Sequence, residues 1–188
     1  MNKKLPIYKC EIEENLNDET GIFAISFVDY PAVEVDFVAL NKQKKIEHKL
    51  HLNSDKQILT GVVLIPDQLI YRYNQATDEE YYITYTIDMF EKISHKMMRN
   101  HFALNNTTHQ HQDQLAGNFL VEMWIVSDPQ NDKSNALGFT DLPKGTLMCS
   151  YKVSDTKYWN EQVKTGNVKG FSLEGYFYQE KPTKKRLS

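Results

Sequence analysis

The chain has 188 residues, of which 40% are hydrophobic and 25% are charged, and its formal net charge is −3 at pH 7. This length fits one domain that buries its own core without metal or disulfide support. The slight acidity argues against nucleic acid as a partner, because nucleic-acid-binding domains usually carry a clear basic excess. Aromatic residues make up 12%, led by eleven Tyr, which favours strands over a helical bundle.

The beginning of the chain predicts a hairpin, a further strand and a linker. Residues 6–13 and 20–28 are rich in strand-forming residues and are separated by a polar, turn-forming stretch. Residues 32–40 alternate apolar and acidic side chains, as a half-buried strand does. Because the polar run at 41–49 indicates a linker, we expect residues 1–50 to form an N-terminal arm.

The middle of the chain predicts two strands and one long helix. An apolar run at 59–66 contains Gly61 and ends at Pro66, as a short buried strand would, and a second strand is expected at 80–86. From residue 88 to residue 100, apolar side chains recur at helical spacing. They are Met89, Phe90, Ile93, Met97 and Met98.

The chain beyond residue 107 predicts four strands and a second helix, which Asp155 caps. The strands are expected at 108–112, 118–127, 146–154 and 170–177, and the helix at 156–166. Strands and helices do not alternate regularly, so a parallel α/β fold is excluded. The expected fold class is α+β, mainly β: an antiparallel β-barrel-like sheet with flanking helices.

Three segments follow from this order. Residues 1–50 are the arm, residues 51–178 form the main domain, and residues 179–188 are expected to be a disordered basic tail. The two cysteines, Cys10 and Cys149, lack the spacing of a zinc site or a disulfide framework, which favours a reducing compartment. No apolar stretch approaches the roughly 18 residues of a membrane span, so we expect a cytoplasmic protein without a membrane partner.

Ser172 is the candidate nucleophile. In an extended strand at 170–177, Ser172 and Glu174 point to one face, while Phe171 and Leu173 point to the other. A serine on the polar face of a strand is also common without any catalytic role. A serine hydroxyl needs a base within hydrogen-bond reach to act as a nucleophile, most often an imidazole.

His109 and His111 are the candidate bases. They alternate with glutamines at 108–112, so a strand there would project both from one face. The H-x-H pair is also half of a metal site, for which Asp113 is the nearest further ligand. The other four histidines are expected to be structural or solvated; they are His48, His51, His95 and His101.

Two glutamates are candidates for the carboxylate that orients the imidazole in a catalytic triad. Glu122 lies in the strand that follows the histidines, and Glu174 shares the face of Ser172. Either is equally explained as a solvent-facing residue of an amphipathic strand. The pattern does not choose between them.

Three runs of sequence resemble the XkdF-like phage serine proteases, relatives of the phage prohead maturation proteases. The runs begin YITYTIDMFEKISHKMMRN, continue with THQHQDQLAGNFLVEMWIVSDPQNDKSNALGF, and end with DLPKGTLMCSYKVSDTKYWNEQVKTGNVKGFSLEGYF. The earlier segment GIFAISFVDYPAVEVDF is similar to the leading part of such proteins. The resemblance implies a fold like that of herpesvirus assemblin.

The resemblance also implies roles for individual residues. Ser172 falls on the nucleophile, and His111 falls on the general base, with His109 as the alternative. Because no histidine follows Ser172, the third group would be a carboxylate, with Glu122 as first choice and Glu174 as the alternative, unless the chain works as a dyad. No cofactor or metal is expected, since acyl transfer needs only water as co-reactant.

The biological expectation is a serine endopeptidase that processes phage scaffold and major capsid proteins during prohead maturation, and that cleaves itself. It would work in the host cytoplasm, inside the assembling procapsid, in association with the prohead or portal and in an oligomer of its own chain. One alternative is a non-catalytic capsid-assembly or scaffolding module with the same fold. Another is a metal-dependent hydrolase built on His109 and His111.

Overall fold

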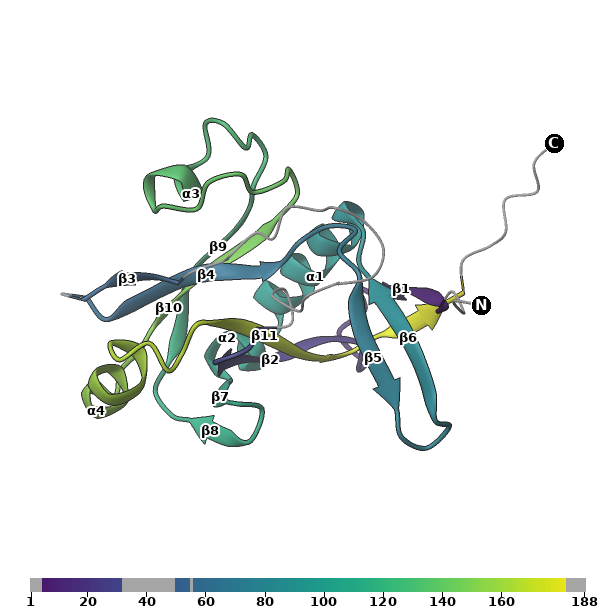
Figure 1. Ribbon diagram of the computed structural model, residues 1–188, viewed down its shortest axis with the longest axis horizontal. Coiled ribbons are helices and arrows are strands. Elements are labelled where there is room, and N and C mark those ends of the chain that lie inside the picture. Colours follow the sequence, from purple (N-terminus) through teal and green to yellow (C-terminus); the bar gives the residue numbers. More distant parts are fainter. Residues whose placement is uncertain (1–4, 32–49, 55, 182–188) are drawn as a thin grey trace.

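The computed structural model describes residues 5–31, 50–54 and 56–181, which form three four-stranded sheets. The described residues are mainly β, with 40% of them in strands and 18% in helices. Figure 1 shows the sheets crossing one another around α1, and among the described residues they stay open rather than closing into a barrel. The predicted fold class is therefore confirmed as mainly β, whereas the barrel-like closure is wrong.

The first sheet joins both ends of the described chain in the order β12-β1-β6-β5. β1 runs parallel to β6, and the other neighbours are antiparallel. Its strands are β1 (Ile7–Glu11), β5 (Ile70–Asn74), β6 (Glu79–Thr84) and β12 (Tyr178–Glu180).

The second sheet is antiparallel throughout, in the order β3-β4-β10-β9. Its central strands are almost wholly buried, since most of their residues are apolar and the hydroxyls of Thr60 and Ser150 bond to each other. Its strands are β3 (His51–Asn53), β4 (Ile58–Leu64), β9 (Phe119–Ile125) and β10 (Leu147–Lys152).

The third sheet has the order β11-β2-β7-β8. β2 pairs antiparallel with β11 and parallel with β7. Its strands are β2 (Gly21–Val28), β7 (Thr107–His109), β8 (Asp113–Leu115) and β11 (Gly170–Tyr176). β1 and β2 thus lie in different sheets, so the predicted N-terminal hairpin is wrong.

Both predicted helices are present. α1 spans Ile87–Arg99, and Met89, Phe90, Ile93 and Met97 are buried as expected from the spacing, whereas Met98 is exposed. Asp155 caps the second helix by accepting from the amides of the first turn; this helix runs as α4 (Thr156–Tyr158) and continues as a π-helical turn, Trp159–Val163. Two short helices were not predicted, α2 (His101–Asn105) and α3 (Lys133–Ala136).

An aromatic cluster joins the second and third sheets. The ring of Phe27 on β2 lies 5.3 Å from that of Phe171 on β11 and 5.8 Å from that of Tyr151 on β10. Gly61 on β4 lets Phe171 approach, because a Cβ atom there would stand 3.2 Å from the Phe171 ring. The strand that carries Ser172 is therefore fixed to the core through its neighbour Phe171.

The predicted strand at 32–40 and the predicted linker at 41–49 lie outside the described residues, as do residues 182–188 of the predicted tail. Within the part of the chain that is described, no helix has both the length and the apolar content of a membrane span.

Candidate active site

Ser172 stands in a row of hydroxyl side chains across the third sheet. It is the register partner of Ser26 on β2, and Ser26 is in turn the partner of Thr108 on β7. Register partners in a sheet project from the same face, about 5 Å apart. The sheet therefore places three hydroxyl-bearing residues side by side, with Ser172 on the edge strand β11.

The alternation predicted for β11 is confirmed. Phe171 packs into the aromatic core, whereas Ser172 lies on the opposite face and is 8% exposed. Gly170, which precedes them, is needed because a Cβ atom there would stand 2.5 Å from the ring of Pro31. The close approach of Pro31 thus fixes where the chain enters β11.

His111 lies in the tight turn between β7 and β8. β7 ends at His109, which is the register partner of Asp113 on β8. Gln110 and His111 have φ of 52° and 59°, in the left-handed region that non-glycine residues rarely adopt. The His111 amide donates to Ser26 Oγ at 2.8 Å, so the turn is bound to the strand beside Ser172.

Glu174 is the carboxylate that contacts His111. Its Oε1 atom lies 3.2 Å from His111 Nδ1, and it also accepts a hydrogen bond from Thr108 Oγ1. The Glu174 side chain is 19% exposed and the His111 side chain 45% exposed, so the pair lies at the surface. A neutral imidazole that donates Nδ1–H to Glu174 keeps Nε2 as a proton acceptor.

His109 belongs to the other face of the sheet. Its Nδ1 atom lies 2.9 Å from the hydroxyl of Tyr158, and the two rings meet edge to face at 5.6 Å. Tyr158 packs in turn against Phe27, and burial raises the pKa of the Tyr158 hydroxyl. The prediction that His109 and His111 project from one face is wrong, because the strand ends at His109 and the turn redirects the chain.

No hydrogen bond joins Ser172 to His111 in the structure, and the Ser172 hydroxyl bonds to no other described residue. The two are linked through Ser26, which neighbours Ser172 and holds the His111 amide. Catalytic hydrogen bonds are often long in unliganded enzymes and tighten when substrate binds.

Residues 44–179 match the family model described as Putative phage serine protease XkdF. The chain belongs to this family. No curated protein matches the chain, and no solved structure does either. The XkdF family match includes Ser172, His111 and Glu174, whereas β2 with Ser26 precedes it.

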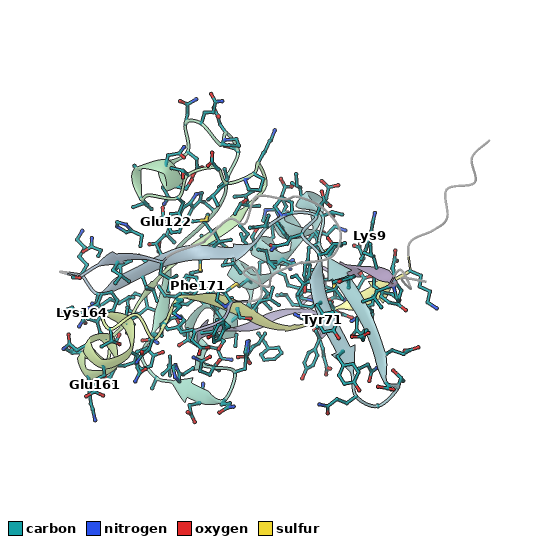
Figure 2. The ribbon with its side chains drawn as sticks, in the orientation of Figure 1. Lys9, Tyr71, Glu122, Glu161, Lys164 and Phe171 are labelled. Atoms are coloured by element: carbon teal, nitrogen blue, oxygen red, sulfur yellow. The ribbon has the colours of Figure 1, made fainter. Side chains whose placement is uncertain are left out.

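Glu122, the first choice for the orienting carboxylate, lies elsewhere in this XkdF family member. It stands on β9, is 49% exposed, and pairs with Lys133 of α3. Figure 2 labels Glu122 on the second sheet and Phe171, the neighbour of Ser172, on β11. The carboxylate at His111 is therefore the alternative, Glu174. The first choice was wrong because the alternation of side chains along a strand does not tell which sheet that strand joins.

The alternative hypothesis, a metal-dependent hydrolase built on His109 and His111, would require ligands that converge on one point, and the described part of the chain does not bring such ligands together. His109 and His111 contact different partners on opposite faces, Tyr158 and Glu174. Among the described residues, no three His, Cys, Asp or Glu side chains gather into a group that could hold a metal ion.

Sequence reasoning missed Ser26 and Thr108. Both are hydroxyl residues in strands that pattern did predict, at 20–28 and 108–112, but their roles depend on which strands pair and in what register. The parallel pairing of β2 with β7 joins segments about eighty residues apart, and it has no local signal in the sequence.

Proposed function

We propose that this chain is a serine endopeptidase with Ser172 as nucleophile, His111 as general base and Glu174 as the orienting carboxylate. The observation that carries the proposal is the contact between His111 Nδ1 and Glu174, two residues from Ser172 on the same face of β11. Membership of the XkdF family supports the reaction class.

The chemistry is acyl transfer in two steps. Ser172 Oγ attacks the carbonyl carbon of the scissile peptide bond while His111 Nε2 takes its proton, and the resulting imidazolium then protonates the departing amine. Water, activated by the same imidazole, hydrolyses the acyl-enzyme and restores the serine. Glu174 stabilises the imidazolium, and its bond from Thr108 fixes the carboxylate in place.

The oxyanion must be stabilised by backbone amides that are not already bonded. Three amides in the glycine-bearing loops are engaged elsewhere: Gly138 donates to Asn135, Gly166 to Val163, and Lys169 to Val28. These three therefore do not form the oxyanion hole in this arrangement.

The proposed substrates are scaffold and major capsid proteins of the assembling prohead, together with the chain itself. The reasoning is the family resemblance: a protease enclosed in a procapsid meets these proteins at high local concentration. Work inside the procapsid, contact with the portal or prohead and self-association belong to the same proposal.

One observation favours a second candidate, a non-catalytic assembly module with the same fold. The Ser172 hydroxyl makes no hydrogen bond to His111, and Ser172 is 8% exposed. Such a module would keep the fold and the hydroxyl row without cleaving anything.

Co-expression with the cognate scaffold and capsid proteins separates the two candidates. We expect the wild type to cleave them, and Ser172→Ala and His111→Ala to lose cleavage by a factor of at least about 10⁴. His109→Ala is the matched control, because it removes a neighbouring imidazole that contacts Tyr158 rather than Glu174.

Two outcomes would count against the protease. If Ser172→Ala cleaves as well as the wild type, the nucleophile is wrong; if the wild type leaves every co-expressed protein intact, the assembly module is favoured. If His109→Ala abolishes cleavage and His111→Ala does not, the base assignment is reversed.

A further inference from the structure

Ser26 occupies the one strand that separates the candidate nucleophile from the candidate base. β2 lies between β11, which carries Ser172, and β7, which leads into His111. Ser26 is fully buried, with 0% of its surface exposed, so its hydroxyl cannot meet a substrate. Its contacts are therefore with the protein itself.

The Ser26 hydroxyl continues the pairing of β2 with β7 after the strand has ended. The last register pair is Phe27 with His109, and the Gln110 amide then donates to the Phe27 carbonyl at 3.1 Å. At His111 the acceptor is no longer a backbone carbonyl but Ser26 Oγ, at 2.8 Å.

The bond from the His111 amide to Ser26 Oγ lies where the backbone conformation is unfavourable. Two successive non-glycine residues in the left-handed region, Gln110 and His111, each cost about 1 kcal/mol or more, and such conformations persist only when surrounding contacts hold them. Without the Ser26 acceptor, the His111 amide has no partner in the sheet, and the turn can relax toward ordinary backbone angles.

We propose that Ser26 is a positioning residue for the protease reaction: its hydroxyl holds the main chain of His111 so that the imidazole stays against Glu174, from where it takes the Ser172 proton during the reaction. This inference rests on the proposed function. It also implies that the catalytic unit includes β2, a segment before the residues that match the XkdF family.

The test compares Ser26→Ala with Ser150→Ala in the full chain. Ser150 is a matched control, because it is also a buried strand serine whose hydroxyl is bonded, to Thr60 at 2.8 Å, yet it lies in the second sheet. Two quantities are measured: kcat and KM on a peptide spanning the cleavage site mapped by co-expression, and the hydrogen-exchange rate of the His111 amide by NMR.

For Ser26→Ala we expect kcat to fall about 10- to 100-fold, the effect of misplacing a catalytic group by about an ångström, with KM within about twofold of wild type. The His111 amide should exchange at least about tenfold faster. Ser150→Ala should leave kcat and this exchange rate unchanged, even where both variants lower the melting temperature alike.

The inference is overturned if Ser26→Ala keeps the kcat of Ser150→Ala, or if the exchange of the His111 amide is the same in both. An inactive wild type is a different result: it removes the proposed function, and the positioning role with it. In that case the exchange rates still decide whether Ser26 holds the turn.

Discussion

Two polar clusters in this molecule differ in how completely their atoms are bonded. In one, Lys96 of α1 meets the segment between β1 and β2; in the other, His111 and Glu174 meet beside Ser172. Both clusters involve the N-terminal part of the chain: Lys96 bonds to the segment between β1 and β2, and His111 bonds to Ser26 on β2. Their bonding suggests that they serve different purposes.

The Lys96 cluster is saturated. The ammonium group, with its side chain 7% exposed, donates to the carbonyls of Glu13 at 2.6 Å and Asp18 at 3.0 Å, and it lies 3.6 Å from the Asp18 carboxylate. Asp18 accepts further bonds from Thr20 and Tyr178. A buried charge that is bonded so fully is explained by structure alone.

The cluster beside Ser172 has bonding capacity left over. Glu174 has two partners, Thr108 and His111, but His111 uses one ring nitrogen in these contacts and the Ser172 hydroxyl bonds to no other described residue. A nucleophilic serine needs a hydroxyl that is free to react and an imidazole that can take its proton. The comparison thus separates a fully bonded structural anchor from the cluster that we propose as the active site.

Among the changes that test this comparison, the largest effect should come from Glu174→Gln. The amide cannot enforce the imidazole tautomer that leaves Nε2 as the acceptor, so we expect kcat/KM to fall about 10³- to 10⁴-fold while the protein stays folded. The measurement is cleavage of the mapped peptide, with the melting temperature recorded in parallel.

Glu122→Gln is the matched control for this change. Glu122 is exposed and paired with Lys133, so its loss should alter stability by less than about 1 kcal/mol and leave kcat/KM unchanged. Equal losses of activity in the two variants would contradict the assignment of Glu174.

Next in size is Lys96→Met, which keeps the length of the side chain and removes its charge. It removes the donor to the carbonyl oxygens of Glu13 and Asp18, so we expect the free energy of unfolding to fall by about 2 kcal/mol. Urea denaturation measures this loss, and the folded fraction should cleave at the wild-type rate. A variant of unchanged stability with reduced kcat would reverse the roles of the two clusters.

The smallest effect is a dependence of stability on pH. Hydrogen bonds from Thr20, aided by Tyr178 and by the charge of Lys96, lower the pKa of Asp18 to about 2 from 3.8. A carboxyl group with a lowered pKa stabilises the fold above its unfolded pKa, and this contribution is lost as the pH falls from about 4 toward 2.

Asp18→Asn should therefore narrow the gap in stability between pH 5 and pH 2.5, as measured by urea denaturation at each pH. Asp88→Asn serves as a comparison, because Asp88 lies in the exposed first turn of α1. If the two variants respond alike to acid, the Asp18 contacts do not set this dependence.

Much of the fold could be predicted because local pattern determines it. The spacing of Met89, Phe90, Ile93 and Met97 predicted α1, and the apolar run at 59–66 predicted β4. The sheets could not be predicted in the same way, because the pairings β1 with β6 and β2 with β7 bring together distant strands. The predicted hairpin placed β1 beside β2 only because they are neighbours in sequence.

The features of the candidate site also divide into those that local sequence predicts and those that depend on how distant segments pair. The alternation of Phe171, Ser172 and Glu174 is a local property of one strand, and the structure has it as predicted. The separation of His109 from His111 depends on two left-handed residues, Gln110 and His111, in a turn that carries no glycine, so no local pattern indicates it. The contact of Glu174 with His111 depends both on that turn and on the register of β11, β2 and β7.

The pairing of β2 with β11 also has a consequence in time. Residues 21–28 are synthesised early, yet their antiparallel partner, residues 170–176, is made last among the described sheets apart from β12. At a translation rate of about 5–20 residues per second, the β11 edge of β2 waits roughly 7 to 30 s for its partner. A nascent chain therefore carries Ser26 and later His111 without Ser172 on the neighbouring strand, and the candidate site is complete only after most of these residues have been made.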